Sequence, residues 1–306
     1  MWPPYSHDMT APMPPARRLG SALEPVTGQV YFSPECHANY HALGFAQSAG
    51  EFNGVAAPDG PAYFTSRGSV MGQVAPELVA AAFAVFSPAA VIPAVTFGWS
   101  ITDAATICAA RDDGAVAQLR RLLGPSPEGL DRANAILRRA VAVLRPEGRP
   151  LYAGLRSLGI PDEPLFAMWR MGDMLREFRG DCHTAAWISM NVDATEIGLM
   201  SELYWGLPMR TYSRTRAWTN DEFAAAEARL VKRGWANDGA LTDAGKAARE
   251  AIEVTTDAQM VPALNAIGGD LDDLISILEP WGAAIRAGRG YPANGPHDLA
   301  EKGRKA

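Results

Sequence analysis

The sequence consists of helix-length blocks rich in Ala and Leu, which alternate with short segments rich in Gly and Pro. The clearest blocks cover residues 102–123, 128–144, 165–190, 221–234 and 242–256. Runs of strictly alternating apolar and polar residues, which indicate half-buried strands, are weak throughout. Apolar residues make up 48% of the chain, which is enough to build a sizeable core. The pattern predicts an all-α, mostly helical protein.

Proline-rich segments suggest how the chain is divided. Residues 1–16 contain five prolines and no apolar periodicity, which predicts a flexible leader. Residues 146–164 contain four prolines and are interpreted as a linker between two helical halves, 17–145 and 165–288. We expect residues 289–306 to form a second flexible tail.

Charge and composition disfavour several classes of protein. A net charge of −6 argues against non-specific binding to nucleic acid or to an anionic membrane. The longest apolar run, residues 74–95, contains Glu77 and three prolines, so it is too interrupted to span a bilayer. Three cysteines without a CxxC pair indicate reduced thiols. The expected protein is cytoplasmic and contacts no membrane.

Residues 218–256 have the most distinctive local pattern. The helical stretch DEFAAAEARLVKRGW contains Gly234, which suits the left-handed position after a helix end. Residues 237–239, Asn-Asp-Gly, suit the tip of a tight hairpin, and Thr242 is a good N-cap for the helix that follows. Helix, hairpin and an LTDAGK helix start together resemble the winged helix of MarR-type regulators. This resemblance implies a fold more than a function.

The wider chain resembles an uncharacterised actinobacterial helix-turn-helix family. The matching segments are SRGSVMG at 66–72, LREFRGDCH at 175–183, the helix after Trp218 and IEVTTD at 252–257. One departure is Phe178, where the family pattern has His. The resemblance implies a helix-turn-helix fold and carries no defined activity.

The two halves share a sparse pattern that is compatible with a duplication. Arg67 is followed after 32 residues by Trp99, and Arg179 is followed after 39 residues by Trp218. Both tryptophans precede a hydroxyl residue with an acid three positions later, the spacing of a capping box at a helix start. The first half is therefore a candidate for a degenerate winged-helix copy, although helical sequences rich in Ala and Arg also produce such matches by chance.

The charges of the winged-helix segment allow two interpretations. Residues 209–249 hold eight Lys and Arg against five acids. The candidate DNA-binding residues are Arg210, Arg214, Arg216 and Lys232. However, the candidate recognition helix begins with Asp221 and Glu222, which would repel phosphates, and the hairpin tip has no cation for a minor groove. DNA binding is therefore disfavoured relative to a scaffold role or homodimerisation.

One face of the helix predicted at 165–190 carries most of the candidate ligand-binding residues. At 100° per residue, Arg176, Arg179, His183 and Trp187 share one side, opposite an apolar stripe. A large indole seldom lies in the middle of a solvated face, so we expect this helix to be buried on several sides. The polar face is then either a pocket or a structural ion-pair network.

Two guanidiniums and an imidazole suit a carboxylate or phosphate ligand, and His183 could transfer a proton near neutral pH. If the duplication holds, Arg67 reaches the same pocket from the first half. Asp181 points away from this face, and it is either the partner of an arginine from another helix or a further ligand-binding candidate. The family resemblance adds Glu253 and Asp257 as further ligand-binding candidates.

No phosphate-binding loop, dinucleotide fingerprint or nucleophile elbow is present, so no cofactor is expected. His37 and His41 have the spacing of a metal clip but lack an HExxH motif, and we expect exposed or capping roles and no metal. The predicted function is binding of a small organic anion in a pocket between the halves, with cofactor-independent catalysis by His183 as an extension. The alternatives are a ligand-responsive winged-helix transcriptional regulator and a purely structural interaction protein.

Overall fold

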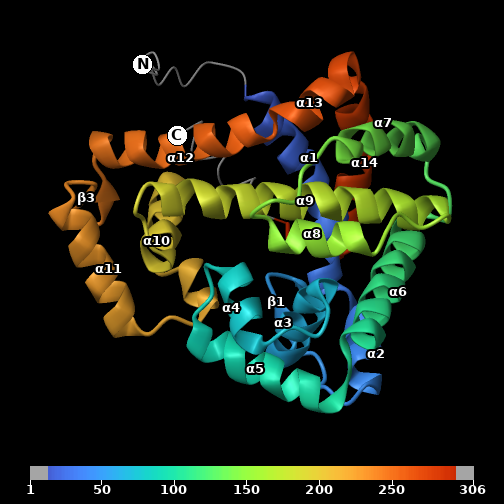
Figure 1. Ribbon diagram of the computed structural model, residues 1–306, viewed down its shortest axis with the longest axis horizontal. Coiled ribbons are helices and arrows are strands. Elements are labelled where there is room, and N and C mark those ends of the chain that lie inside the picture. Colours follow the sequence, from blue (N-terminus) through green and yellow to red (C-terminus); the bar gives the residue numbers. More distant parts are fainter. Residues whose placement is uncertain (1–12, 294–306) are drawn as a thin grey trace.

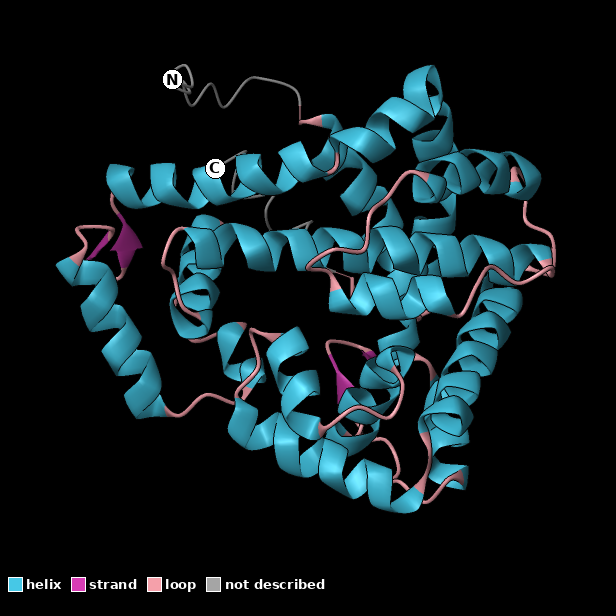
Figure 2. Cartoon of the chain, viewed as in Figure 1, coloured by secondary structure: helices cyan, strands magenta, loops and turns pink. Residues whose placement is uncertain are grey.

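The computed structural model describes residues 13–293, and their regular secondary structure is almost entirely helical (Figures 1 and 2). The α-helices are α1 Pro15–Gly28, α2 Pro34–Ala42, α3 Gly60–Gly68, α4 Pro76–Phe83, α5 Pro88–Ile101, α6 Ala104–Leu123, α7 Leu130–Ala142, α8 Pro150–Ser157, α9 Pro164–Ser189, α10 Ala194–Tyr204, α11 Asn220–Lys232, α12 Asp243–Gln259, α13 Val261–Ile267 and α14 Leu271–Ala287. Short 3-10 helices are η1 Gln29–Phe32, η2 Ser69–Met71, η3 Ser213–Arg216 and η4 Gly268–Asp270. Two-residue strands form the hairpins β1 Glu51–Phe52 with β2 Val55–Ala56, and β3 Ala236–Asn237 with β4 Ala240–Leu241. The prediction of an all-α fold is confirmed.

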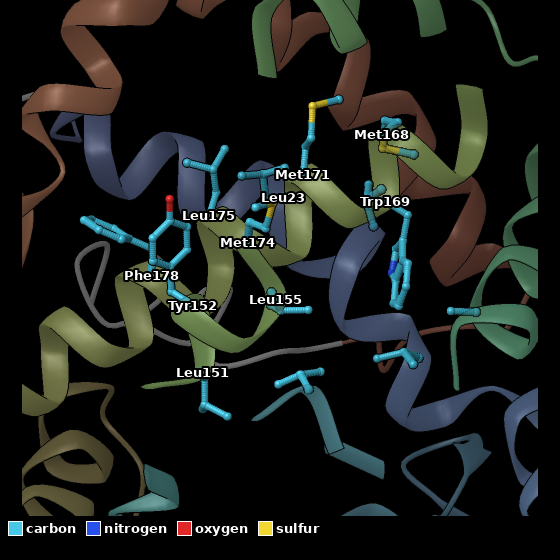
Figure 3. Packing of buried hydrophobic residues seen from close by; sticks show 14 of the residues in the cluster. Leu23, Leu151, Tyr152, Leu155, Met168, Trp169, Met171, Met174, Leu175 and Phe178 are labelled. Carbon is cyan, nitrogen blue, oxygen red and sulfur yellow. The ribbon is translucent and has the colours of Figure 1, made fainter. Parts of the chain in front are cut away.

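Helix α9 runs through the centre of the molecule and packs against α1, α6, α7, α8 and α12 (Figure 1). Its apolar stripe, Met171, Leu175, Phe178 and Cys182, is buried, and Figure 3 shows Leu175 and Phe178 close to Leu23 of α1 and Tyr152 of α8. Burial of one such side chain contributes about 1.5–3 kcal/mol. Because helices cover it on several sides, α9 also buries charged residues, as the sequence suggested.

Buried apolar side chains form two clusters. The larger draws on residues 16–182 and 260–291, and the smaller on residues 186–252. The smaller cluster consists of the end of α9 together with α10, α11, α12 and the β3–β4 hairpin. Helix α9 therefore contributes to both cores.

The segment 146–164 is not the linker that its prolines predicted. It contains α8, whose Leu151, Tyr152 and Leu155 belong to the larger cluster. Pro150 and Pro164 instead occupy the first turns of α8 and α9, where the missing N–H removes no helical hydrogen bond. Proline density here marks helix starts.

The two ends of the described chain are packed against the fold. Ala16, assigned to the flexible leader, is buried in α1. Tyr291, assigned to the flexible tail, is buried, and its hydroxyl donates to Glu24 Oε1 at 3.1 Å. The expectation of loose ends is therefore wrong for Ala16, Tyr291 and Pro292, because these residues are buried. The remainder of the predicted leader and tail, 1–12 and 294–306, lies outside the described residues.

The order helix, hairpin, helix predicted for residues 218–256 is present as α11, β3–β4 and α12. Thr219 and Glu222 form a reciprocal capping box at the start of α11, and the Thr242 side chain accepts from the Gly245 amide at the start of α12. Gly234 has φ of 70°, the left-handed conformation expected after a helix. These local predictions succeed because each depends on neighbours in sequence.

The proposed pairing of the two halves through Arg and Trp is wrong in register. Trp99 lies near the end of α5, whereas Trp218 precedes α11. The cap of α6 is Asp103, which accepts from the Thr106 amide at 2.8 Å, so the predicted cap at Ser100 is also wrong. A helix, a hairpin and a helix do follow one another in the first half, as α2, β1–β2 and α3. A degenerate copy therefore stays a prediction.

Helix α5 is strongly apolar and has no charged residue. Within residues 13–293, no single helix is long and apolar enough to cross a bilayer. Helices α5 and α6 meet that requirement of length and composition only as a pair, and the pair is bent by 98°.

Candidate functional site

A cavity of about 210 Å³ lies beside α9, between α1 and α3. Its apolar lining consists of Leu19, Leu23, Leu175 and Met260, and its polar lining consists of Glu24, Arg67, Arg176, Glu177, Arg179 and Tyr212; Gly20 and Gly180 complete it. Three of the candidate ligand-binding residues from the sequence, Arg67, Arg176 and Arg179, therefore line one cavity. Arg67 reaches it from α3, in the first half of the chain.

Glu177 links two of these arginines. Its carboxylate accepts from Arg67 Nε at 3.1 Å and from Arg67 Nη2 at 2.8 Å. Arg176 Nη1 donates to the same carboxylate at 3.0 Å. Burial raises the pKa of Glu177, but the guanidiniums of Arg67 and Arg176 lower it by more, and the net result is a pKa of about 2. Glu177 is therefore a permanent anion inside the protein.

Arg176 is also paired with Glu24 of α1. Arg176 Nε and Nη2 donate to the two carboxylate oxygens of Glu24 at 2.9 and 3.1 Å. Its guanidinium lies 5.1 Å from the centre of the Tyr31 ring. This bidentate pair and the Arg67–Glu177 pair hold α1, α3 and α9 together around the cavity.

Arg179 is less completely satisfied than the other two arginines. Its Nη2 donates to Glu253 Oε2 at 2.8 Å and lies 3.6 Å from Asp257 Oδ1, both on α12. Its Nε is buried and has no hydrogen-bond partner among residues 13–293. A buried donor without a partner costs roughly 1–3 kcal/mol. The lining holds three arginines and two glutamates, and Glu253 and Asp257, the acids that balance Arg179, lie outside it.

Glu253 and Asp257 do not line the cavity and are instead partners of arginines. Arg249 Nη1 donates to Glu253 Oε1 at 2.7 Å, and Arg17 Nε donates to Asp257 Oδ2 at 2.7 Å. Burial raises the pKa of Glu253, but Arg249 and Arg179 lower it well below its ordinary value. Their proposed role as direct ligand contacts is therefore replaced by a role in holding Arg179.

His183 and Trp187 are not among the cavity-lining residues. His183 Nδ1 lies 3.3 Å from Thr256 Oγ1 and 3.8 Å from Glu253 Oε1. Trp187 is buried in the smaller cluster. Helical angles give the direction of a side chain but not its position along the axis. At 1.5 Å per residue, His183 lies about 6 Å and Trp187 about 12 Å beyond Arg179, so they meet other neighbours.

Asp181 faces the start of α8, in agreement with the prediction that it points away from the arginines. Its Oδ2 accepts from the Tyr152 amide at 3.1 Å. Burial raises the pKa of Asp181 to about 7, and the Tyr152 amide limits the rise. Its proposed ligand contact is therefore replaced by capping of a neighbouring helix.

The histidines considered for metal binding contact the backbone. His37 Nε2 lies 3.1 Å from the Tyr31 carbonyl oxygen, and His41 Nδ1 lies 2.9 Å from that of Phe45. In the described part of the chain, no group of three His, Cys, Asp or Glu side chains is placed to hold a metal ion.

Several residues of the site escaped the sequence analysis. They are Glu24, Glu177 and Tyr212 in the cavity, and Arg17 and Arg249 behind it. Glu177 had a usable signal, because it is an acid next to Arg176 on a helix expected to be buried on several sides. The other four carried no signal, since they join the site from distant segments.

The sequence model of a helix-turn-helix family matches residues 16–292, which include both buried clusters. The chain belongs to this helix-turn-helix family. No curated protein and no solved structure matches the chain.

Two of the four candidate DNA-binding residues of this helix-turn-helix protein are engaged within the fold. Arg210 Nε donates to Glu227 Oε1 at 2.7 Å, and the Arg216 guanidinium lies 4.5 Å from the centre of the Phe86 ring. Arg214 and Lys232 are exposed.

The start of α11 is acidic at the surface. Asp221 and Glu222 are both exposed there, in the first turn of the helix. The hairpin tip, residues 237–239, is exposed and has no cation. An acidic helix start and a hairpin without basic residues are unfavourable for contact with phosphates.

Proposed function

We propose that the protein binds a small organic anion in the cavity between α1, α3 and α9. The observation that carries this proposal is the buried Nε of Arg179, a residue of the cavity lining, which has no hydrogen-bond partner among the described residues. A carboxylate or phosphate oxygen accepts hydrogen bonds from a guanidinium with favourable charge and geometry. An anion that accepts from this Nε would therefore satisfy the donor.

Binding has more support than catalysis by His183. The His183 ring faces Thr256 and Glu253 of α12 and is absent from the cavity lining. A general acid or base must come within hydrogen-bond reach of the reacting group, directly or through one water. We therefore restrict the leading proposal to binding.

A ligand-responsive transcriptional regulator is the second candidate function. Family membership is compatible with DNA binding, and α11, β3–β4 and α12 would then form the MarR-like winged helix. The support for a ligand-responsive regulator is that Arg179, in the cavity lining, contacts Glu253 and Asp257 of α12. Helix α12 directly follows the hairpin of the candidate winged helix. An anion that competes for Arg179 would weaken the attachment of α12 to α9. A homodimer would suit two DNA half-sites.

Thermal shift and calorimetry with a set of small anions test the leading proposal. Some anions should raise the melting temperature of the wild-type protein, since a ligand that binds only the folded state stabilises it. The rise should disappear in Arg179→Gln and persist in Arg138→Gln, which changes an exposed arginine of α7. If no anion binds, the proposal is wrong.

Fluorescence anisotropy with DNA from around the gene tests the second candidate. We expect weak binding at physiological salt, because the start of α11 is acidic. A sequence-specific complex at nanomolar concentration that the bound anion dissociates would reverse the ranking of the two functions.

A further inference from the structure

Tyr212 enters the cavity lining from a different part of the fold than the other lining residues. It lies in the segment 205–219, which joins α10 to α11, whereas the rest of the lining comes from α1, α3, α9 and Met260. The same segment ends at Thr219, the cap of α11. Among the described residues of the lining, Tyr212 alone therefore connects the cavity to the chain that leads into the candidate recognition helix.

The backbone around Tyr212 is held by Glu202 of α10, which is fully buried. Its carboxylate accepts from the amide of Arg210 at 2.7 Å, from the amide of Tyr212, and from the amide of Ser213 at 2.5 Å. These contacts give three amides of one turn a common acceptor inside the protein. The path of the chain is therefore fixed here, and the position of the Tyr212 ring depends on its own contacts.

The Tyr212 side chain is held by Arg216. Arg216 Nη2 donates to the Tyr212 hydroxyl, and the Arg216 guanidinium lies 4.7 Å from the centre of the Tyr212 ring. The other neighbour of this guanidinium is the buried ring of Phe86, at 4.5 Å. A cation between two aromatic rings is attracted to both. Tyr212, Arg216 and Phe86 therefore form one stack of side chains.

The chain between Arg216 and α11 is attached to the loop that joins α4 to α5. The Ser87 amide donates to the Arg216 carbonyl oxygen at 2.9 Å. Trp218 Nε1 donates to the Val85 carbonyl oxygen at 2.8 Å. The stack of three side chains therefore extends from the cavity to the attachment of the residues that precede α11.

The hydroxyl of Tyr212 has a donor to spare. It accepts from Arg216, and its own proton is donated to no residue within 13–293. A hydroxyl that accepts from a guanidinium becomes a stronger donor, because hydrogen bonds in a chain polarise one another. An anion on the Nε of Arg179 is a suitable acceptor, since Arg179 and Tyr212 line the same cavity.

We infer that Tyr212 is a second anion-contacting residue of the cavity, and that its contact with Arg216 couples the occupancy of the cavity to the segment 205–219. This inference rests on the proposed function and adds a means of regulation to it. A bound anion holds Tyr212 and Arg216 in place, and the segment before α11 becomes less mobile. This route does not involve the contact of Arg179 with α12.

Isothermal titration calorimetry with acetate, benzoate and inorganic phosphate tests the contact with the anion. Tyr212→Phe should weaken the tightest-binding of these probes by about tenfold, the usual effect of losing one hydrogen bond to a charged group. Tyr152→Phe is the matched control, because the Tyr152 hydroxyl faces the carbonyl oxygens of Val141 and Leu144. It should leave the affinity unchanged.

Arg216 is not among the cavity-lining residues, so its variants test the coupling. Arg216→Gln should weaken the same probe by more than about threefold, because Tyr212 is then in the binding position for only part of the time. In a Tyr212→Phe background, Arg216→Gln should have no further effect on affinity, as expected for two residues that act through one contact. Arg214→Gln, at an exposed position of the same segment, is the control and should not change the affinity.

Hydrogen exchange of the full chain, measured by mass spectrometry, gives the second readout. A saturating concentration of the same probe should slow exchange in residues 205–219 of the wild type, because local opening becomes rarer when Tyr212 and Arg216 are held. In Tyr212→Phe and in Arg216→Gln, the probe should bind at saturation without this protection. A residue that only supports the fold would change exchange equally with and without the probe.

The outcomes separate the inference from the function on which it rests. A probe that Arg179→Gln loses and Tyr212→Phe binds as tightly as the wild type leaves anion binding intact and overturns the inference. Unchanged exchange of residues 205–219 in the saturated wild type also overturns it, as do effects of Tyr212→Phe and Arg216→Gln that simply add. If none of the three probes binds, the inference fails together with the proposed function.

Discussion

Replacement of Asp181 by Asn should change how stability depends on pH. Asp181 is 5% exposed, and burial raises its pKa to about 7 from an ordinary 3.8. Between these two pH values the folded state binds more protons than the unfolded state, so stability falls as pH rises. Below about pH 4 the carboxyl is protonated in both states and has no effect.

The size of the effect follows from the two pKa values. At 1.36 kcal/mol for each pH unit between them, ionisation of Asp181 costs about 1.5 kcal/mol at pH 5 and about 4 kcal/mol at pH 8. Asn keeps an oxygen that accepts from the Tyr152 amide and has no charge to bury. As the pH rises from 5 to 8, the free energy of unfolding of Asp181→Asn should therefore increase by about 2–3 kcal/mol relative to that of the wild type.

Urea denaturation at pH 5 and pH 8 measures this gain. Other groups titrate in the same range, but the difference between variant and wild type cancels them. Asp113→Asn, at an exposed position of α6, is the matched control and should show no such change. If the difference between Asp181→Asn and the wild type is equal at both pH values, the carboxyl is not the buried acid described here.

Two further substitutions test the packing around the site. Glu177→Gln should cost about 3–5 kcal/mol in urea denaturation, because the part-buried Arg67 loses its carboxylate partner and Arg176 keeps only Glu24. The exposed Glu128→Gln should cost little. Gly245→Ala should cost about 1–3 kcal/mol by the same assay, because its Cβ would overlap the Trp235 carbonyl. Gly269→Ala has open space around the new Cβ and should not have this cost. Equal effects of the two substitutions would contradict the close packing of α12 on the hairpin.

Helix positions and caps were largely predictable because they depend on residues within one turn. The capping box of Thr219 and Glu222 and the cap at Thr242 were correctly predicted. Helix α8 was missed, because prolines at helix starts and prolines in linkers look alike in sequence. The two cases differ only in whether the following side chains are buried.

The sequence alone determined that α9 has an apolar stripe and a polar side that includes Arg176 and Arg179, since both follow from 100° per residue. Only the tertiary structure decided what those arginines meet. Their partners Glu24 and Glu253 lie 152 and 74 residues away. No local periodicity encodes such contacts, because they depend on how helices distant in sequence pack side by side. The same packing separates His183 from the cavity and leaves the Nε of Arg179 without a partner among the described residues.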